Sequence, residues 1–174
     1  MALHEIIHET QAALRNDPTA AGAVFSADSR QVEGVRSEAR IRQFTVTIDE
    51  PPALGGTDAG PNPVELVLAA LAACQEITYR AYATALGVPL DGVSVSLRGD
   101  LDLRGFFAVG DGVRPGFTGV RGTVALTSSA PRAEFEKLRV IVDAHCPVLD
   151  ILKNPVPVEL VLETAPSAAA APNS

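Results

Sequence analysis

The stretch GPNPVELVLAALAAC, residues 60–74, decides how this 174-residue chain is expected to fold. Asn62 is a suitable N-cap, Pro63 favours the first helical position, and Glu65 stands where the acidic residue of a capping box belongs. The helix that begins here is expected to run until Gly87, a residue type that commonly ends helices. Because the helix is apolar on nearly every side, the sequence predicts a central, buried helix.

The segments on either side of this helix carry the patterns of shorter helices and of alternating strands. The N-terminal half is expected to hold a short helix and two strands, at residues 3–15, 23–30 and 35–48. The C-terminal half is expected to hold two strands, a helix, a short helical turn and a last strand, at residues 92–104, 118–128, 130–145, 147–152 and 155–163. This order predicts an α+β domain.

Composition and charge argue against several classes of function. Hydrophobic residues make up 47% of the chain and charged residues 20%, which is typical of a globular protein. The net charge of −7 and the scattered basic residues argue against a nucleic-acid partner. The first residues, MALHEIIHETQ, are too polar for a signal peptide, and the apolar stretch Leu66–Cys74 is too short to span a bilayer. We therefore expect a cytoplasmic protein without a membrane partner.

Residues 4–8 read HEIIH, the spacing of a zinc-hydrolase helix in which two histidines bind the metal and a glutamate acts as the base. A catalytic zinc usually takes three protein ligands, and the only further histidine, His145, lies far along the chain. The helix also begins close to the N-terminus, where fraying is expected. We therefore interpret HEIIH as a polar helix face and expect no metal site.

Two cysteines stand in unusual places. Cys74 lies inside the central helix, where it is either a small core residue or a thiol that needs a nearby cation, since a helix interior offers no positive dipole end. Cys146 precedes Pro147 at the start of the short helix, where backbone amides and the helix dipole favour a thiolate. Packing in a corner between helices is the alternative for Cys146. In a cytoplasmic protein, such cysteines are free thiols or a catalytic pair.

The motifs around these cysteines resemble those of the OsmC/Ohr family of thiol peroxidases. The resemblance rests on PNPVELVLAALAAC at residues 61–74 and CPVLDIL at residues 146–152, with DEPPALGGTDAGPNPVEL and GDLDLRGFF similar to one OsmC-like subgroup. It covers about residues 22–163. Residues 1–21 are then a helical extension, and residues 164–174 form a small-residue tail that we expect to be disordered.

The resemblance implies an OsmC-like fold, with antiparallel sheets around long central helices that pack face to face in an intertwined homodimer. It implies that Cys74 attacks an organic hydroperoxide and that Cys146 resolves the product as a disulfide. An arginine of the first hairpin and a glutamate at the start of the central helix complete such a site. No metal or organic cofactor is implied, and the reductant is expected to be a dithiol of the lipoyl type.

The glutamate has two possible roles. The best-known members carry it directly after Asn-Pro, where this chain has Val64, so the matching carboxylate is Glu65, one residue later. Glu65 is equally well placed to cap the helix and to take part in catalysis. It lies nine residues before Cys74, roughly 13 Å along a helix and about half a turn out of phase. Glu65 and Cys74 can therefore share a small site only across a dimer interface.

The choice of arginine is also open. Four arginines lie in the first hairpin: Arg30, Arg36, Arg40 and Arg42. Arg36 follows the expected turn, where the arginine of the family tends to lie, so it is the first choice. Arg40 and Arg42 would share its face on an ideal strand. Solvated strand residues are the alternative for at least two of the four.

The fold does not by itself guarantee turnover, because one fold can host several functions. The alternative function is a non-catalytic OsmC-like dimer that binds a small apolar or oxidised ligand at its interface. The presence of both cysteines favours the peroxidase.

Overall fold

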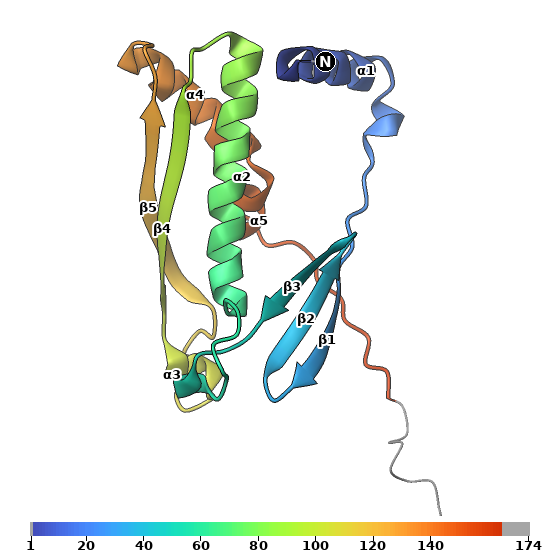
Figure 1. Ribbon diagram of the computed structural model, residues 1–174, viewed down its shortest axis with the longest axis vertical. Helices are drawn as coiled ribbons and strands as arrows, with labels where there is room; N and C mark the ends of the chain where they lie inside the picture. The colour runs from blue at the N-terminus through green and yellow to red at the C-terminus, as the bar shows by residue number, and fades with distance from the viewer. Residues whose placement is uncertain (1, 165–174) are drawn as a thin grey trace, which may run out of the picture.

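The computed structural model describes residues 2–164, and Figure 1 shows how the elements are arranged. The N-terminal part comprises α1 (Leu3–Asn16), a 3-10 turn (Pro18–Ala21), and three strands, β1 (Asp28–Glu33), β2 (Arg36–Ile41) and β3 (Phe44–Ile48). The rest comprises α2 (Pro63–Leu86), β4 (Gly92–Leu101), α3 (Leu103–Phe106), β5 (Phe117–Thr127), α4 (Arg132–His145) and α5 (Pro147–Lys153). The strands form two separate antiparallel sheets, β1-β2-β3 and β4-β5. The predicted α+β class is confirmed.

The long helix α2 begins and ends as its sequence predicts. Asn62 caps it, and the capping box is complete: the Glu65 amide donates to Asn62 Oδ1 and the Asn62 amide donates to Glu65 Oε2, each at 2.9 Å. Gly87 ends the helix in the left-handed region at φ 66°, and its amide donates to the carbonyls of the last turn. Among the residues that the structure describes, no helix has the length and apolar character needed to cross a bilayer.

The loop before α2 is fixed by a buried carboxylate. The Asp49 side chain is only 2% exposed and accepts hydrogen bonds from the amides of Glu50, Thr57 and Ala59 and from the Thr57 hydroxyl. The hydrogen bond from the Thr57 hydroxyl is the main reason that the pKa of Asp49 lies well below its usual range. The three amides also lower this pKa, whereas burial raises it. Gly56 is required here because a Cβ would collide with the Glu50 carbonyl. This loop sets where α2 starts.

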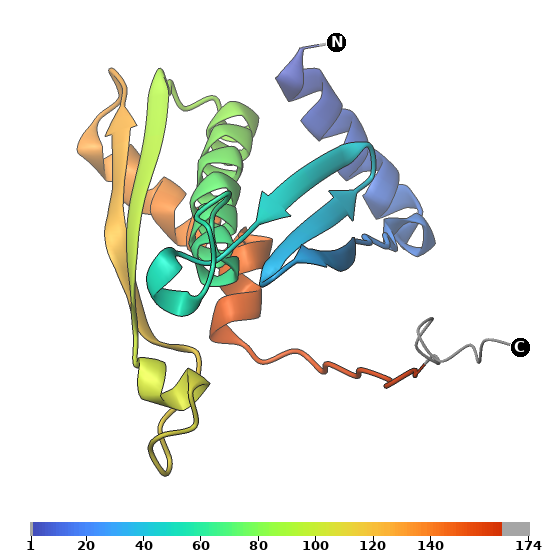
Figure 2. The same cartoon turned by 60° about the horizontal axis from the view of Figure 1, so that its bottom comes forward.

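The core lies where α2 and α4 meet the β4-β5 sheet, as the two views in Figures 1 and 2 show. Its buried members are Tyr79 and Ala83 on α2, Leu90 in the following loop, and Leu138 and Val142 on α4. On the opposite side, α1 contacts part of α2, and Ala70, Ala73 and Ile77 remain exposed. The side of α2 that faces β4 and α4 is thus covered, and the predicted burial on nearly every side is wrong for the single chain.

The first sheet differs from the expected pair of strands. Residues 35–48 form two strands, β2 and β3, because the chain turns at Arg42–Gln43 and pairs Ile41 with Phe44. Arg42 has φ 55°, which the tight two-residue turn requires. Neither Arg nor Gln is a typical turn residue, and the turn is only two residues long, so the prediction from the sequence missed it.

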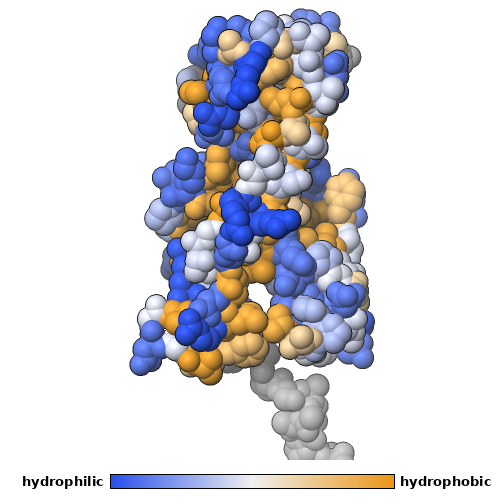
Figure 3. Space-filling view, turned by 90° about the vertical axis from the view of Figure 1, so that its left-hand side faces the viewer, coloured by the Kyte–Doolittle hydropathy of each residue, from blue (hydrophilic) through white to orange (hydrophobic). Residues whose placement is uncertain are grey.

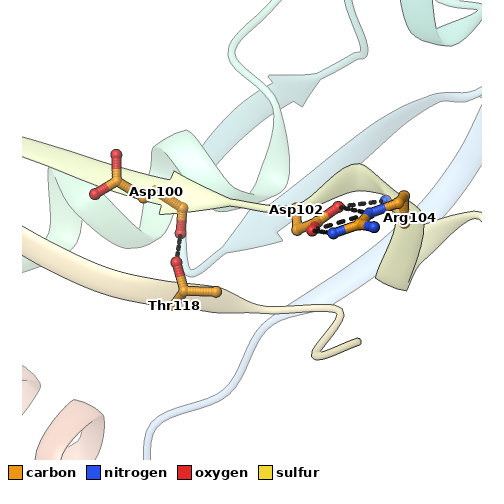
Figure 4. Close-up of polar contacts among 4 residues, drawn as sticks. All are labelled: Asp100, Asp102, Arg104 and Thr118. Atoms are coloured by element: carbon orange, nitrogen blue, oxygen red, sulfur yellow. Dashed lines mark hydrogen bonds and ion pairs between the residues drawn. The ribbon is translucent and has the colours of Figure 1, made fainter. Parts of the chain in front are cut away.

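Polar residues of the GDLDLRGFF motif close the end of the β4-β5 hairpin (Figure 4). Asp102 accepts hydrogen bonds from both the backbone amide and the guanidinium of Arg104 at 3.0 Å, and this bond from the Arg104 side chain lowers the pKa of Asp102. Thr118 donates its hydroxyl hydrogen to the Asp100 carbonyl at 3.0 Å, and Arg121 pairs with the Asp100 carboxylate. These exposed contacts fix the start of α3.

The predicted last strand at residues 155–163 is wrong for the single chain. The segment has no strand partner, and its apolar side chains reach 90% exposure at Leu160. A β-strand needs a neighbour to satisfy its backbone groups, and none of the described strands provides one. Apart from residue 164, the expected disordered tail lies outside the described residues.

Candidate active site

The two cysteine side chains meet although they are 72 residues apart in the sequence. Cys146 Sγ donates to Cys74 Sγ at 3.3 Å, and both residues are free thiols. Cys146 is buried, at 1% exposure, whereas Cys74 is partly open. A thiol pair at this distance needs only a small movement to join as a disulfide.

The break between α4 and α5 brings Cys146 to this position. Cys146 is both the C-cap of α4 and the N-cap of α5, and its backbone is extended, at φ −82° and ψ 111°. Pro147 forces this conformation because its ring disfavours a helical residue before it. α5 then packs against α2 and carries the Cys146 side chain to the helix that holds Cys74.

The surroundings of Cys74 act on its thiol in opposite directions. Burial is the largest influence and raises the pKa of Cys74, and the neighbouring Cys146 raises it further. A hydrogen bond from the backbone amide of Val148, in the first turn of α5, lowers it, and the Thr78 hydroxyl does the same. The amide effect that the sequence led us to expect at Cys146 is therefore found at Cys74. No cationic side chain of the described chain is among these influences.

Thr78 lies one turn beyond Cys74, is 7% exposed, and donates its hydroxyl hydrogen to the Cys74 carbonyl at 2.7 Å. We predict that Thr78→Val raises the pH at which Cys74 becomes reactive, because the valine lacks the hydroxyl that lowers the pKa of this thiol. The measurement is the pH dependence of iodoacetamide alkylation in a Cys146→Ser background, where Cys74 is the only thiol.

Thr84→Val is the matched control for this prediction. Thr84 makes the same bond, to the Arg80 carbonyl at 2.8 Å, but has no sulfur in the preceding turn. Its replacement should leave the alkylation midpoint in place. An equal midpoint in the Thr78→Val and Thr84→Val proteins would show that the Thr78 hydroxyl does not act on the sulfur.

Glu65 does not reach the thiols within one chain. It lies exposed at the start of α2, nine residues before Cys74, and its carboxylate completes the capping box described above. The capping role predicted from the sequence is therefore confirmed. A catalytic role for Glu65 stays a proposal that requires a second copy of the chain.

The arginines of the first hairpin also lie away from the thiols, because the β1-β2-β3 sheet stands apart from α2 (Figures 1 and 2). Arg36 starts β2 and pairs with Glu33 at 2.6 Å. Arg40 lines a surface groove on the sheet together with Arg30 and Glu38. Arg42 leaves the strand at the turn and stacks over Phe44 at 5.3 Å, so the expectation that it shares the strand face of Arg36 is wrong.

The histidines lie outside this thiol pair. His4 and His8 meet edge to face at 5.6 Å on α1, and the described residues contain no group of three or more metal-ligating side chains. His145, which received no role from the sequence, stacks on Tyr82 at 5.4 Å. This stack fixes the end of α4 against α2, one residue before Cys146.

The family of the chain follows from its sequence. A family model described as OsmC-like protein matches residues 56–161, which is more than half of the chain. The chain belongs to this family. The matched range contains both cysteines and begins seven residues before the helix that carries Cys74. Among proteins of curated function, none matches the chain.

Solved structures of OsmC-like proteins share the fold. An OsmC-like protein from Mycoplasma pneumoniae is 19% identical, with a TM-score of 0.67 over 76% of this chain and 89% of that one. An organic hydroperoxide resistance protein from Legionella pneumophila is 23% identical, with a TM-score of 0.58 over 76% and 93%. The organic hydroperoxide resistance protein OhrB of Bacillus subtilis is 21% identical, with a TM-score of 0.51 over 81% and 100%. The predicted OsmC-like fold is confirmed.

Proposed function

We propose that this OsmC-like protein is a thiol peroxidase that reduces organic hydroperoxides through Cys74 and Cys146. The observation that carries the proposal is the 3.3 Å separation of the two sulfurs, which belong to separate elements and have no disulfide between them. Two of the similar structures are of organic hydroperoxide resistance proteins, which supports the choice of substrate class.

The reaction needs only the two thiols and a dithiol reductant. The Cys74 thiolate attacks the terminal oxygen of R–O–O–H, the O–O bond breaks, and Cys74 becomes a sulfenic acid while the alkoxide takes up a proton. The Cys146 thiol then attacks the sulfenic sulfur, forms the 74–146 disulfide and releases water. A dithiol of the lipoyl type reduces this disulfide and is itself oxidised to a cyclic disulfide. No metal or organic cofactor takes part.

The protein acts in this proposal as a homodimer. One face of α2 is exposed and consists of small or apolar residues, Ala70, Ala73 and Ile77, which would allow a second helix to approach closely. The unpaired segment 155–163 exposes 76% of Val158 and 90% of Leu160, which suits a strand that pairs with a second copy. Both surfaces are unfavourable in water when left uncovered.

A second copy would also supply the positive charge that the Cys74 thiol lacks. The Cys74 thiol has a raised pKa, and the part of its own chain that the structure describes supplies no cation to it, so a thiolate at neutral pH needs a positive charge from elsewhere. An arginine of the partner's first hairpin meets this need, with Arg36 as the first choice, and Glu65 of the partner can hold that arginine in place.

The experiment that tests the proposal is steady-state turnover of the reduced protein with tert-butyl and cumene hydroperoxide. Dihydrolipoamide serves as the dithiol and glutathione as the monothiol control. We expect turnover with the dithiol, and a 74–146 disulfide by mass spectrometry when the reductant is omitted. If excess peroxide leaves both thiols reduced, the peroxidase is ruled out and ligand binding without turnover becomes the better hypothesis.

A further inference from the structure

A groove of about 680 Å³ lies between the β4-β5 sheet and the helices that hold the thiols. Val95 and Leu97 of β4 and Val120 of β5 form one wall, and Leu149 and Leu152 of α5 form the other. The groove exists because the helices cover β4 more fully than β5, whose inward-facing Val120 remains 39% exposed. Its size lies within the range of pockets that bind small molecules.

Gln75 supplies a buried, unpaired donor in this groove. It follows Leu71 by one helical turn, and both side chains line the groove from α2. Gln75 is 6% exposed, and its Nε2 has no hydrogen-bond partner among the described residues. A buried amide without a partner is unfavourable and rare in folded proteins. An acceptor atom of a bound molecule would give Gln75 Nε2 the hydrogen bond that it lacks.

The rim of the groove is positive although the chain carries a net charge of −7. Arg114, Arg121 and Lys153 stand around it, with Asp143 as the one acidic residue. Arg121 pairs with Asp100, whereas Arg114 and Lys153 have no ion-pair partner in the part of the chain that the structure describes. Figure 3 views the molecule from the β5 side, where apolar and polar surface patches are interspersed. Such a rim complements an anion.

We propose that this groove binds a single-chain amphipathic acid. The hydrocarbon body lies between the β4-β5 wall and α5, an oxygen atom of the ligand accepts from Gln75 Nε2, and the carboxylate is held by Lys153 and Arg114. The site is distinct from the thiol pair, since neither cysteine lines the groove. Binding there does not depend on the peroxidase reaction, so each can be tested without the other.

The experiment is a fluorescence titration of the reduced, full-length protein with dansyl-labelled undecanoic acid, followed by displacement with decanoate, 1-decanol and decylamine. We expect saturable binding of the probe, with decanoate displacing it at least about tenfold better than the alcohol or the amine, because only the acid satisfies the rim. Lys153→Glu should remove this preference, whereas Lys137→Glu, on the exposed face of α4, should keep it.

Gln75→Leu separates a ligand-binding role from a structural one. Leucine keeps the volume but removes the unpaired amide, so the variant should bind the probe about tenfold more weakly and yet melt roughly 2–4 °C higher. Gln43→Leu, in the exposed β2–β3 turn, is the control and should change neither value. A lower melting temperature in Gln75→Leu together with no probe binding by the wild type would mean that a second copy fills the groove, and would overturn the proposal. Equal displacement by all three competitors would overturn it too.

Discussion

Cys74→Ser is expected to abolish peroxide consumption, whereas Cys146→Ser should still consume one equivalent per chain. In the proposed reaction the two variants differ, because the serine hydroxyl cannot replace the Cys74 thiolate, whereas Cys146 is needed only after the O–O bond has broken. Loss of the attacking group should lower the rate roughly a thousandfold or more, as loss of a nucleophile does in other enzymes. Stopped-flow measurement of peroxide consumption, with mass spectrometry of the products, gives both values.

The two variants also leave different products. Cys146→Ser should accumulate a sulfenic acid on Cys74, which dimedone traps, because the only thiol 3.3 Å away has been removed. Oxidised wild type should carry no such adduct, since in the proposed reaction Cys146 converts the sulfenic acid to a disulfide. A dimedone adduct on Cys146 in the Cys74→Ser protein, with peroxide consumed at the wild-type rate, would reverse the assigned roles.

The central helix and the place of each cysteine relative to its helix can be predicted from the sequence, because neighbouring residues determine where each helix begins and ends. Asn62, Pro63, Glu65 and Gly87 each act on the backbone next to them, so the start and end of α2 can be found without tertiary information. The helix break at Cys146 follows in the same way from Pro147. These features also carry the family resemblance.

The remaining features depend on contacts that a linear pattern does not encode. The 3.3 Å contact between the sulfurs, and the Val148 amide that acts on Cys74, exist only because α5 packs back onto α2. Gln75 looks like any polar residue until the sheet and α5 enclose it. The prediction of the last strand failed for the opposite reason. Residues 155–163 do alternate, but a strand forms only where it has a partner, and the strands described in one copy provide none.

Ile77→Glu is expected to split the proposed dimer and to remove its peroxidase activity together with it. Ile77 is 69% exposed in the single chain, so glutamate there should leave the chain folded, as judged by circular dichroism. In a dimer with facing α2 helices, the change would bury two carboxylates against each other and weaken association by about a hundredfold or more. Light scattering at micromolar concentration should then report 18.1 kDa, whereas Ile77→Leu should keep twice that mass.

The activity of the Ile77→Glu protein tests where the activating cation comes from. Both thiols stay in place in this variant, so a loss of peroxide consumption means that the second copy supplies a needed group. If that group is the guanidinium of Arg36, then Arg36→Ala should keep the dimer but react only at higher pH, because the Cys74 thiol would then keep its raised pKa. Arg40→Ala and Arg42→Ala are the controls that identify the arginine. A folded monomer that consumes peroxide at the wild-type rate would refute the dimeric site, because Cys74 would then need no group from a second chain.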